Sequence, residues 1–525
     1  MRSSGVLMHI SSLPSSYGIG TMGAEAKEFV DFLKNAGQTY WQILPLCPTS
    51  YGNSPYQSFS SFAGNPYFID LSEICKAGYL TKEECESYAW CMDDTLVDYG
   101  LLYDNRYALF QKAYERFKKK KPKDFKKFCK ENSDWLFDYA FFMALKIKNH
   151  GKSWIDWSDE IKFRNKKVLK TLEKELDSEI ESFQMLQYFF FQQWNQLKEY
   201  ANKKGISIIG DVPIYVAGDS ADVWANPAQF YLDKNLNMIE VAGCPPDAFS
   251  DEGQLWGNPL FRWDYMKKDR YAWWGKRLKA MSAMYDLIRI DHFRGFDSYY
   301  TIPFGETTAK NGTWKKGPGK AMFDYLEKRL GKLNIIVEDL GYLTPSVKKM
   351  VADCGYPGMK VLQFAFGERK DNVYQPHNYP VHCVVYTGTH DNDTILGWAK
   401  TSSRETLDFA KDYLRLSKEE GYNWGMMKAA WASVAELSIV TMQDLLDLSS
   451  KARMNEPSTM GDNWMWRMKK NDLTKELEEK LNLYMNVYAR APKKKGKSTE
   501  NKKENNKKNN KENTKKEQKK KEIKK

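Results

Sequence analysis

The amino-acid sequence predicts an α/β protein, a (β/α)8 TIM barrel with large inserted, mainly helical subdomains. Eight short apolar runs are spread along the chain, and several of them end in polar residues. Such runs are typical of strands that are buried on both faces of a parallel sheet. Helical patterns at 24–34 and 320–330 lie between some of them, as a barrel requires. The predicted strands are residues 5–10, 40–46, 206–212, 287–291, 335–338, 361–364, 383–386 and 437–441.

Two intervals between predicted strands are too long for a simple crossover, at about 52–204 and 218–285. We expect both to hold inserted subdomains. The first contains aromatic-rich helical patterns at 135–148 and 182–200, whose apolar residues are assigned to core packing. Residues 1–492 are therefore predicted to form one catalytic barrel with two insertions.

Residues 493–525 are predicted to be a disordered tail rich in Lys, Asn and Glu. The tail holds sixteen Lys and five Glu, so it carries +11 of the formal net charge of +12. It contains no aromatic residue and one Ile, too little apolar surface to offset the entropy of ordering. A nucleic-acid-binding arm is the functional alternative, but no aromatic residues are interleaved with the lysines. We expect a solvated extension and no nucleic-acid partner.

Several classes of site are not indicated by the sequence. The eight cysteines include no Cys-x-x-Cys pair, which argues against zinc and against a disulfide framework. No His-Glu-x-x-His pattern, dinucleotide fingerprint or phosphate loop is present, so no metal or cofactor is predicted. The first ten residues do not resemble a signal peptide, and no run approaches eighteen apolar residues. The sequence therefore predicts a cytoplasmic protein without a membrane partner.

Three carboxylates come at the ends of predicted strands, namely Asp291, Glu338 and Asp391. The carboxyl ends of barrel strands converge on one pocket, so these side chains are expected to meet. A single carboxylate after a strand is usually a helix cap or an ion-pair member. Together, they match the pair of carboxylates that cleaves a glycosidic bond, with a third to stabilise the positively charged sugar ring.

The neighbours of these carboxylates suggest their ionisation states. Arg289 precedes Asp291 by two residues and points to the same side of a strand, so its charge is expected to hold Asp291 ionised. Glu338 ends an apolar run, where desolvation would raise its pKa and keep a proton available. Asp339 is the alternative for this role, because sequence spacing favours neither residue.

Aromatic residues and histidines near these segments are candidates for sugar binding. Tyr51, Tyr56 and Trp256 lie in Gly-rich surroundings, and flat sugar faces stack on such rings. Packing is the alternative interpretation for each ring. His292 and His390 each adjoin a candidate catalytic carboxylate and are expected to donate hydrogen bonds to sugar hydroxyls, although a single His is usually structural.

Taken with further segments, these motifs resemble glycoside hydrolase family 77, the amylomaltases and plant disproportionating enzymes. The resemblance extends over nearly the whole of residues 5–490. Its segments are residues 5–14, 17–20, 51–60, 63–66, 210–214, 243–247, 253–259, the three carboxylate segments, and 453–457 with 463–464.

The resemblance implies a role for each matching residue. It implies that Asp291 is the nucleophile, that Glu338 rather than Asp339 is the general acid and base, and that Asp391 stabilises the transition state. Further substrate contacts that it implies are Arg289, His292 and His390 at the reacting sugar, Asp247, Phe249 and Trp256 in a mobile loop, and Asp211, Tyr51, Ser54, Tyr56 and Asn463.

The activity implied is that of a 4-α-glucanotransferase, which moves a segment of an α-1,4-glucan to the 4-hydroxyl of an acceptor by retaining double displacement. The expected partners are maltooligosaccharides and glucans derived from glycogen or starch. The alternatives are an α-1,4-glucan hydrolase, in which water is the acceptor, and a non-catalytic glucan-binding protein.

Overall fold

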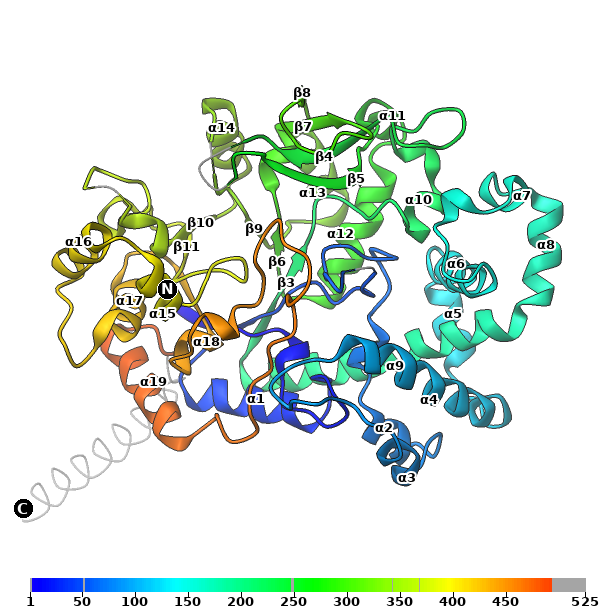
Figure 1. Cartoon of the computed structure of the whole chain (residues 1–525), viewed down its shortest axis with the longest axis horizontal. Coiled ribbons are helices and arrows are strands. Elements are labelled where there is room, and N and C mark those ends of the chain that lie inside the picture. The colour runs from blue at the N-terminus through cyan, green and yellow to red at the C-terminus, as the bar shows by residue number, and fades with distance from the viewer. Residues whose placement is uncertain (1, 51, 247–249, 342, 368, 493–525) are drawn as a thin grey trace, which may run out of the picture.

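A computed structural model describes residues 2–50, 52–246, 250–341, 343–367 and 369–492 (Figure 1). Eight parallel strands close into a barrel in the order β1-β12-β11-β10-β9-β6-β3-β2. This confirms the predicted (β/α)8 fold. The barrel strands are β1 (Ser3–Leu7), β2 (Tyr40–Gln42), β3 (Ser207–Val212), β6 (Leu287–Ile290), β9 (Ile335–Val337), β10 (Gly358–Val361), β11 (Cys383–Tyr386) and β12 (Leu437–Thr441).

The alternation of side chains along the strands separates an inner core from an outer one. Ile209, Ile336 and Ile439 belong to the inner cluster, whereas Ile208 and Ile290 pack into the outer cluster. Successive side chains of a strand point to opposite faces, and in a closed barrel both faces are buried. This double burial is why the strands could be recognised as continuous apolar runs.

Helices surround the barrel. The 28-residue helix α9 (Asp177–Lys204) packs against α1 (Ala24–Asn35) and ends at Gly205, whose φ of 85° suits glycine. Of the helices described, none has the length and apolar character needed to cross a membrane. The others around the barrel are α13 (Lys320–Leu330), α14 (Pro345–Cys354), α15 (Ile395–Thr401), α16 (Arg404–Leu414), α17 (Gly421–Ala432), α18 (Met442–Leu445) and α19 (Lys475–Val487).

The long segment between β2 and β3 is helical and lies to one side of the barrel, on the right of Figure 1. Within it, α6 (Leu136–Lys148) packs along α9. The remaining helices of this segment are α2 (Leu71–Lys76), α3 (Lys82–Glu86), α4 (Tyr99–Lys119), α5 (Phe125–Glu131), α7 (Asp159–Lys162) and α8 (Lys166–Glu175). Three more, α10 (Ala221–Ala225), α11 (Trp263–Lys268) and α12 (Ala272–Met284), lie between β3 and β6.

A four-stranded antiparallel sheet, in the order β5-β4-β7-β8, was not among the predicted elements. It lies at the top of Figure 1. Two of its strands, β4 (Glu240–Cys244) and β5 (Gln254–Pro259), come from the second insertion; β7 (Ser298–Pro303) and β8 (Thr313–Lys316) follow β6. β4 pairs directly with β7, although β6 lies between them in the sequence. The sheet therefore depends on long-range pairing that a local pattern does not reveal.

One predicted strand is misplaced. The run at 361–364 was expected to be a strand, but residues Leu362–Ala365 form a 3-10 helix and the strand is Gly358–Val361. Gly358 and Lys360 interrupt the apolar pattern. Gly358 is needed because a Cβ atom there would lie 2.5 Å from the Asp339 carboxylate.

Arg490 joins both ends of the described chain through a set of buried hydrogen bonds. Its guanidinium is fully buried and donates to the carbonyl oxygens of Trp431 (2.6 Å), Ser3 (2.7 Å), Ser433 (3.1 Å) and Ala435 (3.1 Å). Buried carbonyl groups need such partners, since an unsatisfied one costs its desolvation energy. Arg490 therefore connects the start of β1 to the segment that enters β12.

We expect Arg490→Met to lower the free energy of unfolding by about 3 kcal/mol, because several buried carbonyls lose their donor at once. Urea unfolding followed by circular dichroism measures this change. Arg2→Met is the control, since Arg2 also donates to main-chain oxygens in this region but is partly exposed. Equal losses in the two variants would contradict the role given to Arg490.

Candidate active site

A buried ion-pair system lies at the carboxyl ends of β3 and β6. Asp211 and Arg289 are paired in register, and the Asp291 amide extends β6 by donating to the Val212 carbonyl at 3.0 Å. The Arg289 guanidinium contacts Asp211 Oδ2 at 2.6 Å and Asp291 Oδ1 at 3.0 Å. The predicted contact of Arg289 with Asp291 is thus confirmed. The side chains of Arg289 and Asp211 are 3% and 0% exposed, but that of Asp291 is 28% exposed and so remains accessible.

Asp291 was expected to be ionised, but its surroundings favour the protonated carboxyl. Burial raises the pKa of the Asp291 carboxyl to about 8; Arg289 opposes this, whereas Asp211, Glu338 and Asp391 reinforce it. Arg289 favours the ionised carboxylate in the expected direction, but burial outweighs it, so the expectation that Arg289 keeps Asp291 ionised is wrong for the site as described. Burial also works against the charge of Arg289, but Asp211 and Asp291 hold its pKa well above the ordinary value.

Glu338 follows β9 and is held by two main-chain amides. Its Oε2 accepts from the His292 amide at 2.7 Å and its Oε1 from the Leu340 amide at 2.8 Å. Burial raises the pKa of Glu338, and Arg289 and the two amides oppose that rise. Since Asp291 and Glu338 influence each other, the pair titrates as a unit and retains a proton at higher pH than ordinary carboxyls.

Asp339 is engaged elsewhere. Its Oδ1 accepts from the Met359 amide at 2.6 Å, which connects the end of β9 to β10. Burial raises the pKa of Asp339 to about 6, and Lys360 and the Met359 amide oppose that rise. The geometry therefore favours Glu338 over Asp339 as the carboxyl that faces the ion-pair system.

His292 lies between Asp291 and Glu338 in an unusual backbone conformation. Its φ of 50° is left-handed, and it caps the 3-10 helix Phe293–Phe296. Burial lowers the pKa of His292 to about 3, so the ring is neutral. Its Nε2 is buried without a hydrogen-bond partner among the described residues. The Trp256 ring meets it edge to face at 4.7 Å, and Trp256 Nε1 donates to Gln254 Oε1.

His390 and Asp391 lie on the loop between β11 and α15. His390 Nε2 is 3.3 Å from Asp391 Oδ1, and the His390 ring stacks on Tyr56 with 5.1 Å between centroids. Burial lowers the pKa of His390, and Asp391 opposes this effect. Tyr56 donates its hydroxyl to Asp211 at 2.9 Å. Tyr56 thereby connects the ion-pair system in the barrel to the His390–Asp391 loop.

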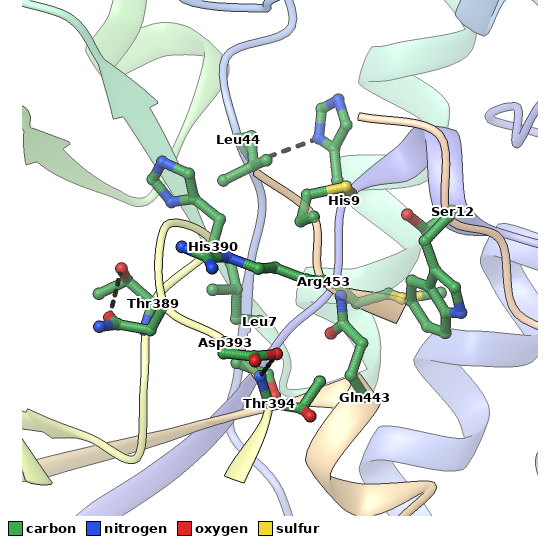
Figure 2. Close-up of a pocket in the computed structure, with 15 residues that line it drawn as sticks. Leu7, His9, Ser12, Leu44, Thr389, His390, Asp393, Thr394, Gln443 and Arg453 are labelled. Carbon is green, nitrogen blue, oxygen red and sulfur yellow. Dashed lines mark hydrogen bonds between the residues drawn. The ribbon is translucent and has the colours of Figure 1, made fainter. Parts of the chain in front are cut away.

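A small cavity of about 20 Å³ lies beside this loop, at the ends of β1, β11 and β12 (Figure 2). Figure 2 shows Thr389 and His390 on one side, His9 and Ser12 on the other, and Arg453 between them. His9 Nδ1 accepts from the Leu44 amide at 3.2 Å, and burial lowers the His9 pKa to about 3. Asp291, Glu338 and Asp391 do not line this cavity, so it borders the loop rather than holding the reacting centre.

The other predicted site residues are placed differently. Asp211 is buried under Arg289, so it supports the ion pair instead of lining the surface as a substrate contact. Ser54 forms a turn in which its Oγ accepts from the Tyr56 amide at 3.2 Å. Asn463 is partly exposed, and its Oδ1 accepts from the Glu456 amide. Tyr51, Asp247 and Phe249 lie outside the described residues, and their assignments stay predictions.

Sequence reasoning gave no role to Asn455 and Arg453, although their segment was part of the resemblance. Asn455 Nδ2 donates to Asp391 Oδ1 at 2.7 Å, and Arg453 donates to the Asp391 carbonyl at 2.7 Å. The contact spans more than sixty residues, so no local pattern could reveal it. Within the described residues, no group of three His, Cys, Asp or Glu side chains is arranged to hold a metal ion.

Comparisons with known proteins agree with this geometry. A family model described as 4-alpha-glucanotransferase, glycoside hydrolase family 77, matches residues 8–474. The chain belongs to this family. A 4-alpha-glucanotransferase of Clostridium butyricum is 50% identical over 476 residues, which cover 90% of this chain and 98% of that protein. One of Thermus thermophilus is 45% identical over 486 residues, covering 90% and 96%.

A solved structure is also similar over almost the whole fold. It is an amylomaltase from Streptococcus agalactiae in complex with acarbose, with a TM-score of 0.92 and 42% identity. The match covers 94% of this chain and 100% of that one. The chain is therefore an enzyme of the family that transfers segments of α-1,4-glucans, as the sequence predicted.

We expect Asp291→Asn to stabilise the fold, and more strongly at high pH. The folded-state pKa of about 8 exceeds that of an unfolded aspartate, so the free energy of unfolding of the wild type falls as pH rises between the two values. Asparagine does not titrate and avoids this loss. The midpoint of thermal unfolding at pH 8 should rise by about 3 °C, with little change at pH 4.

Scanning calorimetry at both pH values tests this expectation. Asp353→Asn is the control, because Asp353 pairs with Lys349 on an exposed helix face. It should leave the midpoint close to that of the wild type. A gain for Asp291→Asn that is the same at pH 4 and pH 8 would show that burial does not govern the titration of Asp291.

Proposed function

We propose that Asp291 is the nucleophile of a retaining double displacement, with Glu338 as general acid and base and Asp391 as transition-state stabiliser. The observation that carries the proposal is the Asp211–Arg289–Asp291 ion-pair system, whose charges act on both Asp291 and Glu338. A glycosidase-type centre needs one ionised and one protonated carboxyl near the same bond. Burial raises the pKa of both Asp291 and Glu338, so one of the two carboxyls can hold a proton while the other is charged.

In the first half of the reaction, an Asp291 oxygen attacks the anomeric carbon of the glucan donor. The bond from this carbon to the glycosidic oxygen of the departing glucan breaks, and Glu338 gives its proton to that glycosidic oxygen. The productive form has the charge on Asp291, 3.0 Å from the Arg289 guanidinium, and the proton on Glu338. Positive charge on the sugar ring is stabilised by Asp391. A glycosyl ester on Asp291 is the product of this half.

In the second half, the 4-hydroxyl of an acceptor glucan attacks the same carbon. Glu338 accepts the proton of that hydroxyl, the ester bond breaks, and Asp291 is released as a carboxylate. Two inversions give overall retention of the α configuration. Water would give hydrolysis by the same route, so transfer requires that the acceptor side be shielded from water.

The described side chains offer contacts for the sugar. The unpartnered Nε2 of His292 and the neutral His390 supply polar groups for sugar hydroxyls, and Tyr56 offers an aromatic ring. Arg289 is 3% exposed and acts on the sugar through Asp291. We propose maltooligosaccharides and glucans from glycogen or starch as substrates. The acarbose complex of the Streptococcus agalactiae amylomaltase supports binding of an oligosaccharide-like ligand.

We also propose that the enzyme acts in the cytoplasm. The eight cysteines include no Cys-x-x-Cys pair and show no disulfide framework in the sequence, a usage that suits a reducing compartment.

Incubation with maltotriose alone is the experiment that tests the proposal. We expect free glucose and longer oligosaccharides at a constant number of reducing ends. Asp291→Asn and Glu338→Gln should each lower the rate by at least about 10³-fold, because each removes a group that forms or breaks a bond. Rising reducing ends without longer products would instead indicate a hydrolase, and a near-normal rate for Asp291→Asn would exclude Asp291 as nucleophile.

We expect Trp256→Ala to raise the share of hydrolysis. The Trp256 ring covers His292 next to the reacting carboxylates, and its removal opens this position to water. The ratio of glucose released by hydrolysis to glucose transferred should rise by about threefold. This corresponds to a change of about 0.7 kcal/mol in the difference between the two activation free energies. Trp314→Ala is a control on an exposed strand of the antiparallel sheet. An unchanged ratio for Trp256→Ala would contradict the shielding role.

A further inference from the structure

The segment 453–455 holds the loop that carries His390 and Asp391 through three hydrogen bonds. The Asn455 amide donates to the His390 carbonyl at 3.1 Å, and the Arg453 guanidinium donates to the Asp391 carbonyl at 2.7 Å. The third bond reaches the side chain itself, from Asn455 Nδ2 to Asp391 Oδ1 at 2.7 Å. Arg453 Nε also donates to the Asn455 carbonyl at 2.9 Å, which fixes the two residues relative to each other.

This arrangement distinguishes the two oxygens of the Asp391 carboxylate. Oδ1 accepts from Asn455 and lies 3.3 Å from His390 Nε2. Both of these contacts use Oδ1, and among the described side chains none donates a hydrogen bond to Oδ2. The Asp391 side chain is 42% exposed. A carboxylate fixed through one oxygen presents the other in a defined direction. For Asp391, Oδ2 is the oxygen left to face a bound sugar.

We propose that Asn455 is a positioning residue for the transfer reaction, and that its side-chain amide orients Asp391 so that Oδ2 meets the positive charge developing on the sugar ring. The inference rests on the proposed role of Asp391. It adds a residue that acts through Asp391, with no contact to the sugar required of Asn455.

A neutral amide is suited to this position. The charged or titratable groups around Asp391 are Arg453, which donates to its carbonyl and pairs with Glu456, and His390 beside it. Tyr56 lies on the facing loop, and Asp291 and Glu338 act on Asp391 from the ends of β6 and β9. Three of them, Asp291, Glu338 and Glu456, are carboxyls, so another negative charge at 455 would add to the repulsion. An amide instead donates a hydrogen bond and leaves the charge of Asp391 intact.

Two variants test the side-chain bond. Asn455→Ala removes it, and Asn455→Asp keeps the shape and the main-chain bond to His390 but replaces the donor with a second carboxylate. With maltotriose as substrate, each should lower kcat by about 10- to 100-fold and leave KM within about threefold. This is expected when a catalytic group is misplaced for the chemical step while substrate binding is retained. Asn226→Ala is the matched control, since Asn226 Nδ2 donates to a main-chain oxygen outside this loop and its loss should leave kcat unchanged.

The pH profile separates positioning from a merely structural role. For Asn455→Asp, the rate relative to wild type should fall further as pH rises, because both carboxylates become ionised and repel each other. A purely structural bond predicts a constant ratio. Circular dichroism and the unfolding midpoint show whether each variant is folded.

Asp391→Ala makes the two proposals distinguishable. If Asp391→Ala is inactive and Asn455→Asp is folded with a normal, pH-independent rate, the inference about Asn455 is overturned while the role of Asp391 stands. If Asp391→Ala itself retains the wild-type rate, the proposed role of Asp391 fails, and the inference about Asn455 fails with it. Loss of kcat in both Asn455 variants, with the expected pH dependence, supports the positioning role.

Discussion

The buried guanidinium of Arg289 is the interaction on which the active site depends. It is the cation that contacts both Asp211 and Asp291, in a barrel interior where unpaired charges are strongly disfavoured. Asp211 fixes Arg289 from the adjacent strand, and Tyr56 fixes Asp211 from the loop after β2. The position of the candidate nucleophile is therefore set by a chain of contacts that runs from the barrel core to the rim.

The same arrangement makes the site costly for the fold. Asp211 and Asp291 contact one guanidinium, Glu338 and Asp391 lie close enough to act on Asp291, and burial raises the pKa of Asp291 and of Glu338. A protein selected for stability alone would not place them together. Burial, reinforced by the neighbouring carboxyls, favours a proton on one member of the pair, which general acid catalysis requires. The feature that destabilises the barrel is thus the one that suits it to the proposed chemistry.

Burial explains how far the sequence could predict this structure. Strands buried on both faces read as apolar runs, so the barrel and the strand-end residues Asp291 and Glu338 were predictable. At β10, Gly358 and Lys360 break the run, and the prediction fell three residues too late. The antiparallel sheet and the contact of Asn455 with Asp391 were not predictable, because both join segments far apart in the chain. The burial of Asp291, which outweighs the charge of Arg289, was likewise not predictable from sequence spacing.

The catalytic carboxylates differ in how they are supported. Asp291 directly continues β6 and keeps a strand-like hydrogen bond to Val212, so the barrel itself fixes its position. Asp391 lies five residues beyond the end of β11, on the loop that leads to α15. Thr394 begins α15 after this loop, and the segment 453–455 holds it from the other side. A barrel supplies rigid strand ends for some catalytic groups; a group on a longer loop needs side chains from elsewhere to reach comparable precision.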